Sequence, residues 1–194
     1  MRILLTSLSI LLFAISSFGQ DKPLPFDERG KLIYYEVVAS TKAPKDSLIS
    51  RAKTFFESDA KKFKISSIKA DTLLEATGKM MISKSALGMA RPMGAVDYNF
   101  YVEVKEGKYR FWLTDFVFVP YMRDRYGNFV PTTTIGAPLE REQGKLREAE
   151  WLGYQKITAR EAKTLAEQFK TALATMIYAP ETPKPKNTIS TKKW

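Results

Sequence analysis

The stretch Tyr98–Phe118, YNFYVEVKEGKYRFWLTDFVF, is the most strongly patterned part of the chain and decides the fold. Aromatic and β-branched residues alternate with polar residues on both sides of Glu106 and Gly107. This pattern is typical of two antiparallel strands joined by a tight turn. A two-residue turn sets Lys105 opposite Lys108; a three-residue loop with a bulge at Gly107 is the alternative, and the pattern of paired faces favours the two-residue turn. We therefore predict a β-hairpin over the whole stretch.

The register set by this turn sorts the hairpin into two faces. The first face is apolar throughout and is predicted to be core; it consists of Phe100, Val102, Val104, Tyr109, Phe111 and Leu113. The second face sets Glu103 opposite Arg110 and Tyr101 opposite Trp112, and both are favourable cross-strand pairs. A shift by one residue would mix the two faces. Only the second face is therefore a candidate for recognition.

The far end of the second strand is less regular. We expect Asp115 at the end of the apolar face, beside Tyr98 and near the rim of the sheet. Phe116 is a further candidate for the recognition face.

Upstream of the hairpin, the pattern predicts a strand over Lys31–Ser40 and a helix of about five turns over Ala43–Phe63. Two short strands follow, over Lys64–Asp71 and Thr72–Ser83. The segment Ser83–Ala95 is rich in Gly, Met, Pro and Ala, which favours a loop.

Downstream, Thr158 and Glu161 have the spacing of a capping box, so we expect a helix to begin there. Its apolar residues keep helical spacing as far as Ile177, and Pro180 lies just beyond. Residues 122–157 are an insertion of unclear pattern, and a further hairpin, an irregular loop and a short helix all fit them.

The predicted order is strand, helix, four strands, helix. Runs of antiparallel strands beside two amphipathic helices indicate the α+β class. We expect a curved antiparallel sheet with both helices packed on one face. Two helices are too few to cover both faces, so the other face should stay open at least in part.

Three blocks, taken in order, resemble a bacterial family known as domain of unknown function 4468, which is described as having a TBP-like fold. They are GKLIYYEVV, KDSLISRAKTFF and VEVKEGKYRFWLTDF. The resemblance covers roughly Leu24 to Phe118 and leaves out Met122–Trp151. It implies the same order of strands and helices, and export in Gram-negative bacteria. Because the family has no established activity, it implies no catalytic residues.

The first 19 residues are typical of an export signal. Arg2 provides positive charge, Ile3–Ile15 is mostly apolar, and the small residues Ser17 and Gly19 precede an expected cleavage before Gln20. This apolar run is too short to span a membrane. We expect a periplasmic or secreted protein with no transmembrane segment in the mature chain.

Residues 20–180 are long enough for one domain with its own core. Residues 181–194, ETPKPKNTISTKKW, are rich in Pro and Lys, which predicts a disordered basic tail. The chain has no cysteine, which excludes disulfides and a lipid anchor on cysteine and suits a bacterial periplasm.

The chain also has no histidine, so His-based triads, thiol nucleophiles and the common zinc sites are excluded. An enzyme would depend on carboxylates or on a Ser/Lys pair near Ser83–Ser85. The available carboxylates are Glu75, Asp97, Glu103 and Asp115. Their spacing gives no sign of convergence. We expect a non-enzymatic domain with no cofactor and no metal.

The hypothesis for function rests on Tyr101, Trp112, Arg110 and Glu103 on the open face. Exposed aromatic side chains there suit a protein, glycan or lipidic ligand. The alternative is a purely structural envelope protein in which residues 122–157 cover this face. Nucleic acid is not expected, because Glu103 would repel phosphate and the chain carries an export signal.

Overall fold

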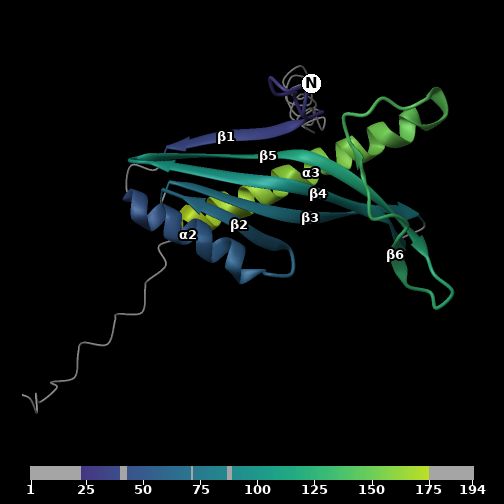
Figure 1. Ribbon diagram of the computed structural model, residues 1–194, viewed down its shortest axis with the longest axis horizontal. Helices are drawn as coiled ribbons and strands as arrows, with labels where there is room; N and C mark the ends of the chain where they lie inside the picture. Colours follow the sequence, from purple (N-terminus) through teal and green to yellow (C-terminus); the bar gives the residue numbers. More distant parts are fainter. Residues whose placement is uncertain (1–22, 40–42, 71, 87–88, 175–194) are drawn as a thin grey trace, which may run out of the picture.

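The computed structural model describes residues 23–39, 43–70, 72–86 and 89–174 (Figure 1). Its elements in chain order are β1 (Ile33–Ala39), α2 (Lys45–Ser58), β2 (Phe63–Lys69), β3 (Leu73–Ala86), β4 (Met89–Lys105), β5 (Lys108–Arg123), β6 (Phe129–Pro131), β7 (Ala137–Pro138) and α3 (Lys145–Ala174). The five longer strands form an antiparallel sheet in the order β1-β5-β4-β3-β2, and short β6 and β7 pair with β5. The predicted α+β class is confirmed.

The hairpin β4–β5 has the predicted register. Lys105 lies opposite Lys108, Glu103 opposite Arg110 and Tyr101 opposite Trp112. The turn is tight because Gly107 adopts a φ of 72°, a left-handed conformation that costs glycine little. The predicted apolar face is buried as core.

Both helices cover this apolar face, as expected, and Figure 1 shows them on one side of the sheet. From α2, the ring of Phe56 lies 5.0 Å from that of Phe100 in edge contact. From α3, Phe169 lies 5.1 Å from both Phe100 and Phe111. Aromatic rings prefer such tilted and edge contacts. Phe169 therefore sits at the centre of the core, between the two helices and the hairpin.

The prediction of a loop over Ser83–Ala95 is wrong. Strands β3 and β4 stay paired as far as Ala86 and Met89 and form a long two-stranded ribbon. The β4–β5 pairing ends at Gly94, so Pro92 in β4 has no partner in β5. The β3–β4 register also shifts next to it, between Ile82 and Ser83. On that side there is no ladder hydrogen bond for proline to lose.

The predicted capping box is also wrong. Helix α3 runs without a break from Lys145 to Ala174, and Thr158 lies buried in its middle. The helix begins 13 residues earlier than predicted because it continues along the core: Tyr154 stacks on Phe118 at 4.3 Å. Helix α2 is shorter than predicted: it ends at Ser58, and Phe63, which was predicted to be its last residue, begins β2.

The insertion 122–157 contains both a hairpin and a helix. It completes the β5–β6 hairpin, adds β7 to the edge of β5 and supplies the first turns of α3. The predicted export signal (1–19) and the predicted tail (181–194) lie outside the described residues. Within the described part of the chain, no helix is long and apolar enough to cross a membrane.

Candidate functional site

The open face of the sheet is centred on two aromatic side chains. Tyr101 of β4 and Trp112 of β5 lie directly opposite each other, and their rings stack with centroids 5.1 Å apart and planes inclined by 14°. Both side chains are half-buried. The hairpin register fixes this pair, because each residue alternates with a core residue on its strand.

A charged pair adjoins these rings along the hairpin. The Arg110 guanidinium carbon lies 5.4 Å from the centre of the Trp112 ring, within cation–π range. Arg110 also donates through Nε to Glu103 Oε2 at 2.6 Å. This hydrogen bond lowers the pKa of Glu103 and raises the pKa of Arg110, so both groups stay charged at neutral pH. The four predicted residues therefore form one cluster.

Three members of the cluster, Tyr101, Trp112 and Arg110, line a groove of about 660 Å³, whose wall was not predicted from the sequence. Tyr35 of β1 lies opposite Trp112 and extends the aromatic floor, and residues 26–29 form the wall. The run Ile33–Val38 is nearly apolar on both faces, so its pattern does not show which side chains face outward. Only the pairing of β1 with β5 assigns Tyr35 to the groove.

The wall is tied to the sheet through a bulge in β5. Asp115 has a φ of 56°, and the register with β4 shifts beside it. The bulge turns Asp115 away from the core face, where it was expected, and its Oδ2 accepts from Asn99 Nδ2 at 3.1 Å. Arg29 Nη2 lies 3.9 Å from the same carboxylate. The bulge also moves Phe116 into the core, so its assignment to the open face is wrong.

Each of the candidate carboxylates already has a polar or charged partner. Glu75 accepts from Lys69 Nζ and from Ser67 Oγ, both at 2.7 Å, and these hydrogen bonds lower its pKa. Asp97 lies 3.4 Å from Lys79 Nζ. In the Ser83–Ser85 stretch, Lys84 Nζ lies 3.1 Å from Glu150. Among the described residues, no three acidic side chains gather as they would around a metal ion.

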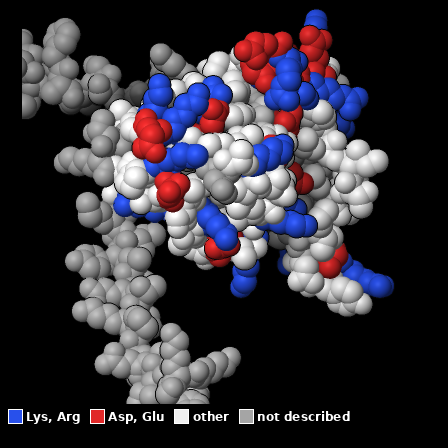
Figure 2. All heavy atoms as spheres, turned by 60° about the vertical axis from the view of Figure 1, so that its left-hand side comes forward, with Lys and Arg blue, Asp and Glu red and all other residues white. Residues whose placement is uncertain are grey.

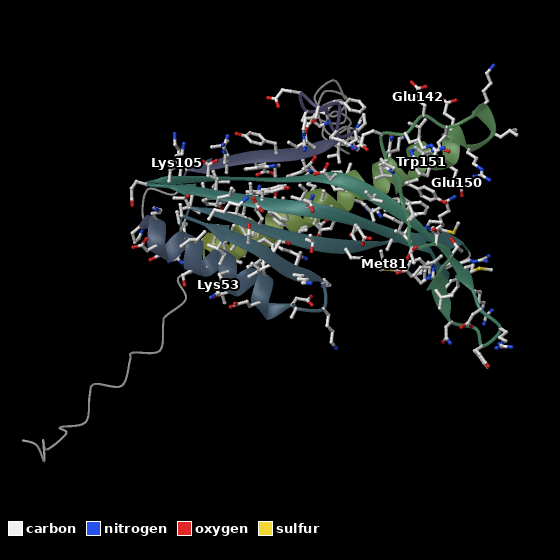
Figure 3. The ribbon with its side chains drawn as sticks, in the orientation of Figure 1. Lys53, Met81, Lys105, Glu142, Glu150 and Trp151 are labelled. Atoms are coloured by element: carbon white, nitrogen blue, oxygen red, sulfur yellow. The ribbon has the colours of Figure 1, made fainter. Side chains whose placement is uncertain are left out.

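The insertion lies at the other end of the molecule from the hairpin turn. Figure 3 shows Lys105 at one end of the long axis and Glu142, Glu150 and Trp151 at the other. Trp151 donates through Nε1 to the Leu139 carbonyl at 2.9 Å and meets Phe118 edge-on. The contacts of the insertion thus run along the outer half of β5 and along α3. They also reach the start of β1, where Glu140 Oε1 accepts from the Leu32 N–H at 2.8 Å. No residue of the insertion lines the groove.

Comparison with known proteins agrees with this architecture. Residues 34–119 match the family model described as "Domain of unknown function (DUF4468) with TBP-like fold". The fold is TBP-like. No curated protein matches the sequence.

Two solved structures share the TBP-like fold over most of the chain. A TBP-like protein from Parabacteroides distasonis has a TM-score of 0.58 at 14% identity, covering 77% of this chain and 96% of that one. A DUF4468 family protein from Bacteroides ovatus has a TM-score of 0.56 at 14% identity, covering 81% of this chain and 94% of that one. At such identity the likeness concerns the fold alone.

Proposed function

We propose that this chain is an exported, non-enzymatic binding module that recognises its ligand on the open face of the sheet. Stacked Tyr101 and Trp112, half-buried in the groove bounded by residues 26–29, carry this proposal. Ligand sites are concave and combine aromatic surface with a few fixed polar groups. Arg110 and Glu103 are such groups, because each is held by the other.

The chemistry of the face argues against catalysis. A general acid needs a carboxyl pKa raised towards neutrality. Here the pKa values of Glu75 and Glu103 are lowered by their cationic partners. Lys84 Nζ lies 3.1 Å from Glu150, so its ion-pair partner lies outside the Ser83–Ser85 stretch.

Charge distribution argues against nucleic acid as the ligand. A nucleic-acid site is expected to gather basic side chains along one face. On the side shown in Figure 2, acidic and basic side chains are interspersed. Glu103 and Glu75 both lie on the open face, where they would repel phosphate. The formal net charge of +10 for the full chain is thus not expressed as a basic stripe on this side.

The test uses Trp112 as the reporter. The chain has three tryptophans, so Trp151→Phe and Trp194→Phe leave Trp112 as the only one. Its emission is followed during titration with a neutral oligosaccharide, an extended peptide and phosphatidylglycerol vesicles. We expect one class to give a saturable change, weakened at least tenfold by Tyr101→Ala. Tyr126→Ala is the matched control, because Tyr126 is exposed on the β5–β6 hairpin, which belongs to the insertion.

The outcomes separate the two functional readings. A saturable response that depends on Tyr101 supports the binding module. No response to any of the three classes would favour the alternative, a structural envelope protein whose open face has no ligand. Detection of the chain in the periplasmic or culture fraction, with loss of residues 1–19 seen by mass spectrometry, tests export separately.

A further inference from the structure

The two edges of the sheet are built differently. The β2 edge has a register shift between Ile65 and Ser67 and carries lysines at 62, 64 and 69, which are common devices against strand pairing. The β1 edge, IYYEVVA, has neither a register shift nor a lysine. Among the described residues no strand lies beyond it. An unprotected edge of this kind is a template for another strand.

The backbone groups that would pair are identified by a hydrogen bond at the start of β1. The Ile33 N–H donates to the Pro25 carbonyl at 2.9 Å, on the side of β1 away from β5. Because backbone groups alternate in direction along an antiparallel strand, the N–H groups of Tyr35, Val37 and Ala39 also point outward. Among the described residues, the segment at Pro25 occupies the edge only at its beginning and leaves it free from Tyr35 onward.

The edge adjoins the proposed binding face. Tyr35 and Val37, 48% and 57% exposed, project onto the open face from β1. Tyr35 lines both the groove of about 660 Å³ and a second hollow of about 190 Å³. A strand added beside β1 would place alternate side chains next to Tyr35 and next to Val37, above these two hollows.

The charges around the second hollow indicate the charge of the partner segment. The hollow is lined by Val37, Glu103, Arg110, Lys105 and Lys108. Glu103 is shared by Arg110 and Lys105, whereas among the described residues Lys108 has no ion pair. The hollow therefore carries an excess of positive charge. A carboxylate on the added strand, next to Val37, would offset it.

We propose that an extended acidic segment of a partner protein pairs with β1 through Tyr35, Val37 and Ala39. This inference rests on the proposed function and names the ligand class for the same face. Such β-augmentation draws affinity from main-chain hydrogen bonds and specificity from alternate side chains. A second copy of the chain fits less well, because the one carboxylate of its own β1, Glu36, is paired with Lys170 of α3 and is not available beside Val37. The chain's own C-terminal segment is lysine-rich and has the wrong charge.

The probe is an acetylated, amidated heptapeptide of alternating Val and Glu added to the full chain. Amide hydrogen exchange, followed by NMR, is read at Tyr35, Val37 and Ala39, with Ile68 on the β2 edge as the control position. We expect at least tenfold slower exchange at the three β1 amides and no change at Ile68. Lys108→Glu should weaken binding at least fivefold. A matched peptide of alternating Val and Lys should bind the original chain at least tenfold more weakly.

Three outcomes would overturn this inference. If N-methylation of the peptide along its pairing edge leaves its affinity unchanged, strand pairing is wrong. If ultracentrifugation shows a dimer that protects the same amides without peptide, the occupant is a second copy. If an oligosaccharide or a vesicle changes Trp112 emission while the peptide protects none of the three amides, the acidic-segment assignment fails and the binding face stands.

Discussion

Arg29 and Asp115 join the N-terminal turn of the domain to the bulge in β5, with Nη2 and Oδ2 3.9 Å apart. Arg29 also pairs with Asp27 inside its own turn, at 2.9 Å, and donates to Thr114 Oγ1 at 3.4 Å. The wall of the groove is thereby attached to the strand that carries Trp112. Asp115, which has a left-handed backbone conformation and lies outside the aromatic cluster, thus helps to position the wall of the groove.

The strain at this bulge can be measured by two substitutions. Asp115→Ala and Asp115→Gly both remove the contacts with Arg29 and Asn99, but a φ of 56° is strained for Ala and not for Gly. We expect the Ala variant to be less stable than the Gly variant by about 1 kcal/mol, because Cβ is disfavoured in this region. Urea denaturation of both variants checks this. Equal stability would mean that the strand relaxes to an unbulged form.

The Glu103–Arg110 pair gives a pH dependence. The pKa of Glu103 is lowered by Arg110 in the folded chain relative to its ordinary value of 4.5. Its contribution to stability is therefore fully present above about pH 4.5 and is lost as the pH falls through the lower folded value. The contribution should stay under about 1 kcal/mol, since Arg110 is about half exposed.

Glu103→Gln tests that sign directly. The variant should be less stable than the original chain at pH 7, and the difference should shrink towards pH 3, as measured by urea midpoints. Glu106→Gln, at the exposed turn of the same hairpin, is the control and should show no such convergence. A difference that grows on acidification would contradict the prediction.

Thr158 and Thr114 are buried threonines in opposite situations. Thr158 Oγ1 is buried with no hydrogen-bond partner in the described chain, whereas Thr114 Oγ1 donates to the Leu32 carbonyl at 3.2 Å. Thr158→Val should keep or raise the free energy of unfolding, by up to about 1 kcal/mol, because an unsatisfied hydroxyl is removed. Thr114→Val should lower it by about 1 kcal/mol. Thermal unfolding of both variants distinguishes them, and a destabilised Thr158→Val would contradict an unsatisfied Thr158 hydroxyl.

Phe169 should be the most costly single truncation in the core. Its ring contacts Phe55, Phe56, Phe100 and Phe111, so Phe169→Ala leaves a cavity between both helices and the hairpin. We expect a loss of about 3–5 kcal/mol by urea denaturation. Leu146→Ala, at a fully exposed position on the same helix, should change stability by less than about 0.5 kcal/mol. A loss below about 1 kcal/mol for Phe169→Ala would contradict this packing.

The hairpin was predictable residue by residue because its alternation has a period of two and its turn contains glycine. The aromatic cluster followed from the same register. The bulge at Asp115 was not predictable, because one extra residue in a strand leaves the composition unchanged and only reverses the phase beyond it, which moved Phe116 into the core. The start of α3 was predicted wrongly at Thr158 because a capping motif is a local signal. The contact of Tyr154 with Phe118, which extends α3 towards its N-terminus, joins distant parts of the chain.

The unequal edges of the sheet also limit what the molecule can assemble into. Within the described residues, the sheet offers one pairing edge and protects the other with lysines and a register shift, so after it accepts a single strand it has no unprotected edge of its own. Growth stops after one addition, so edge pairing cannot propagate from chain to chain into a fibre. The asymmetry therefore limits the number of strands that the sheet can accept to one, and this limit would protect the sheet from polymerisation.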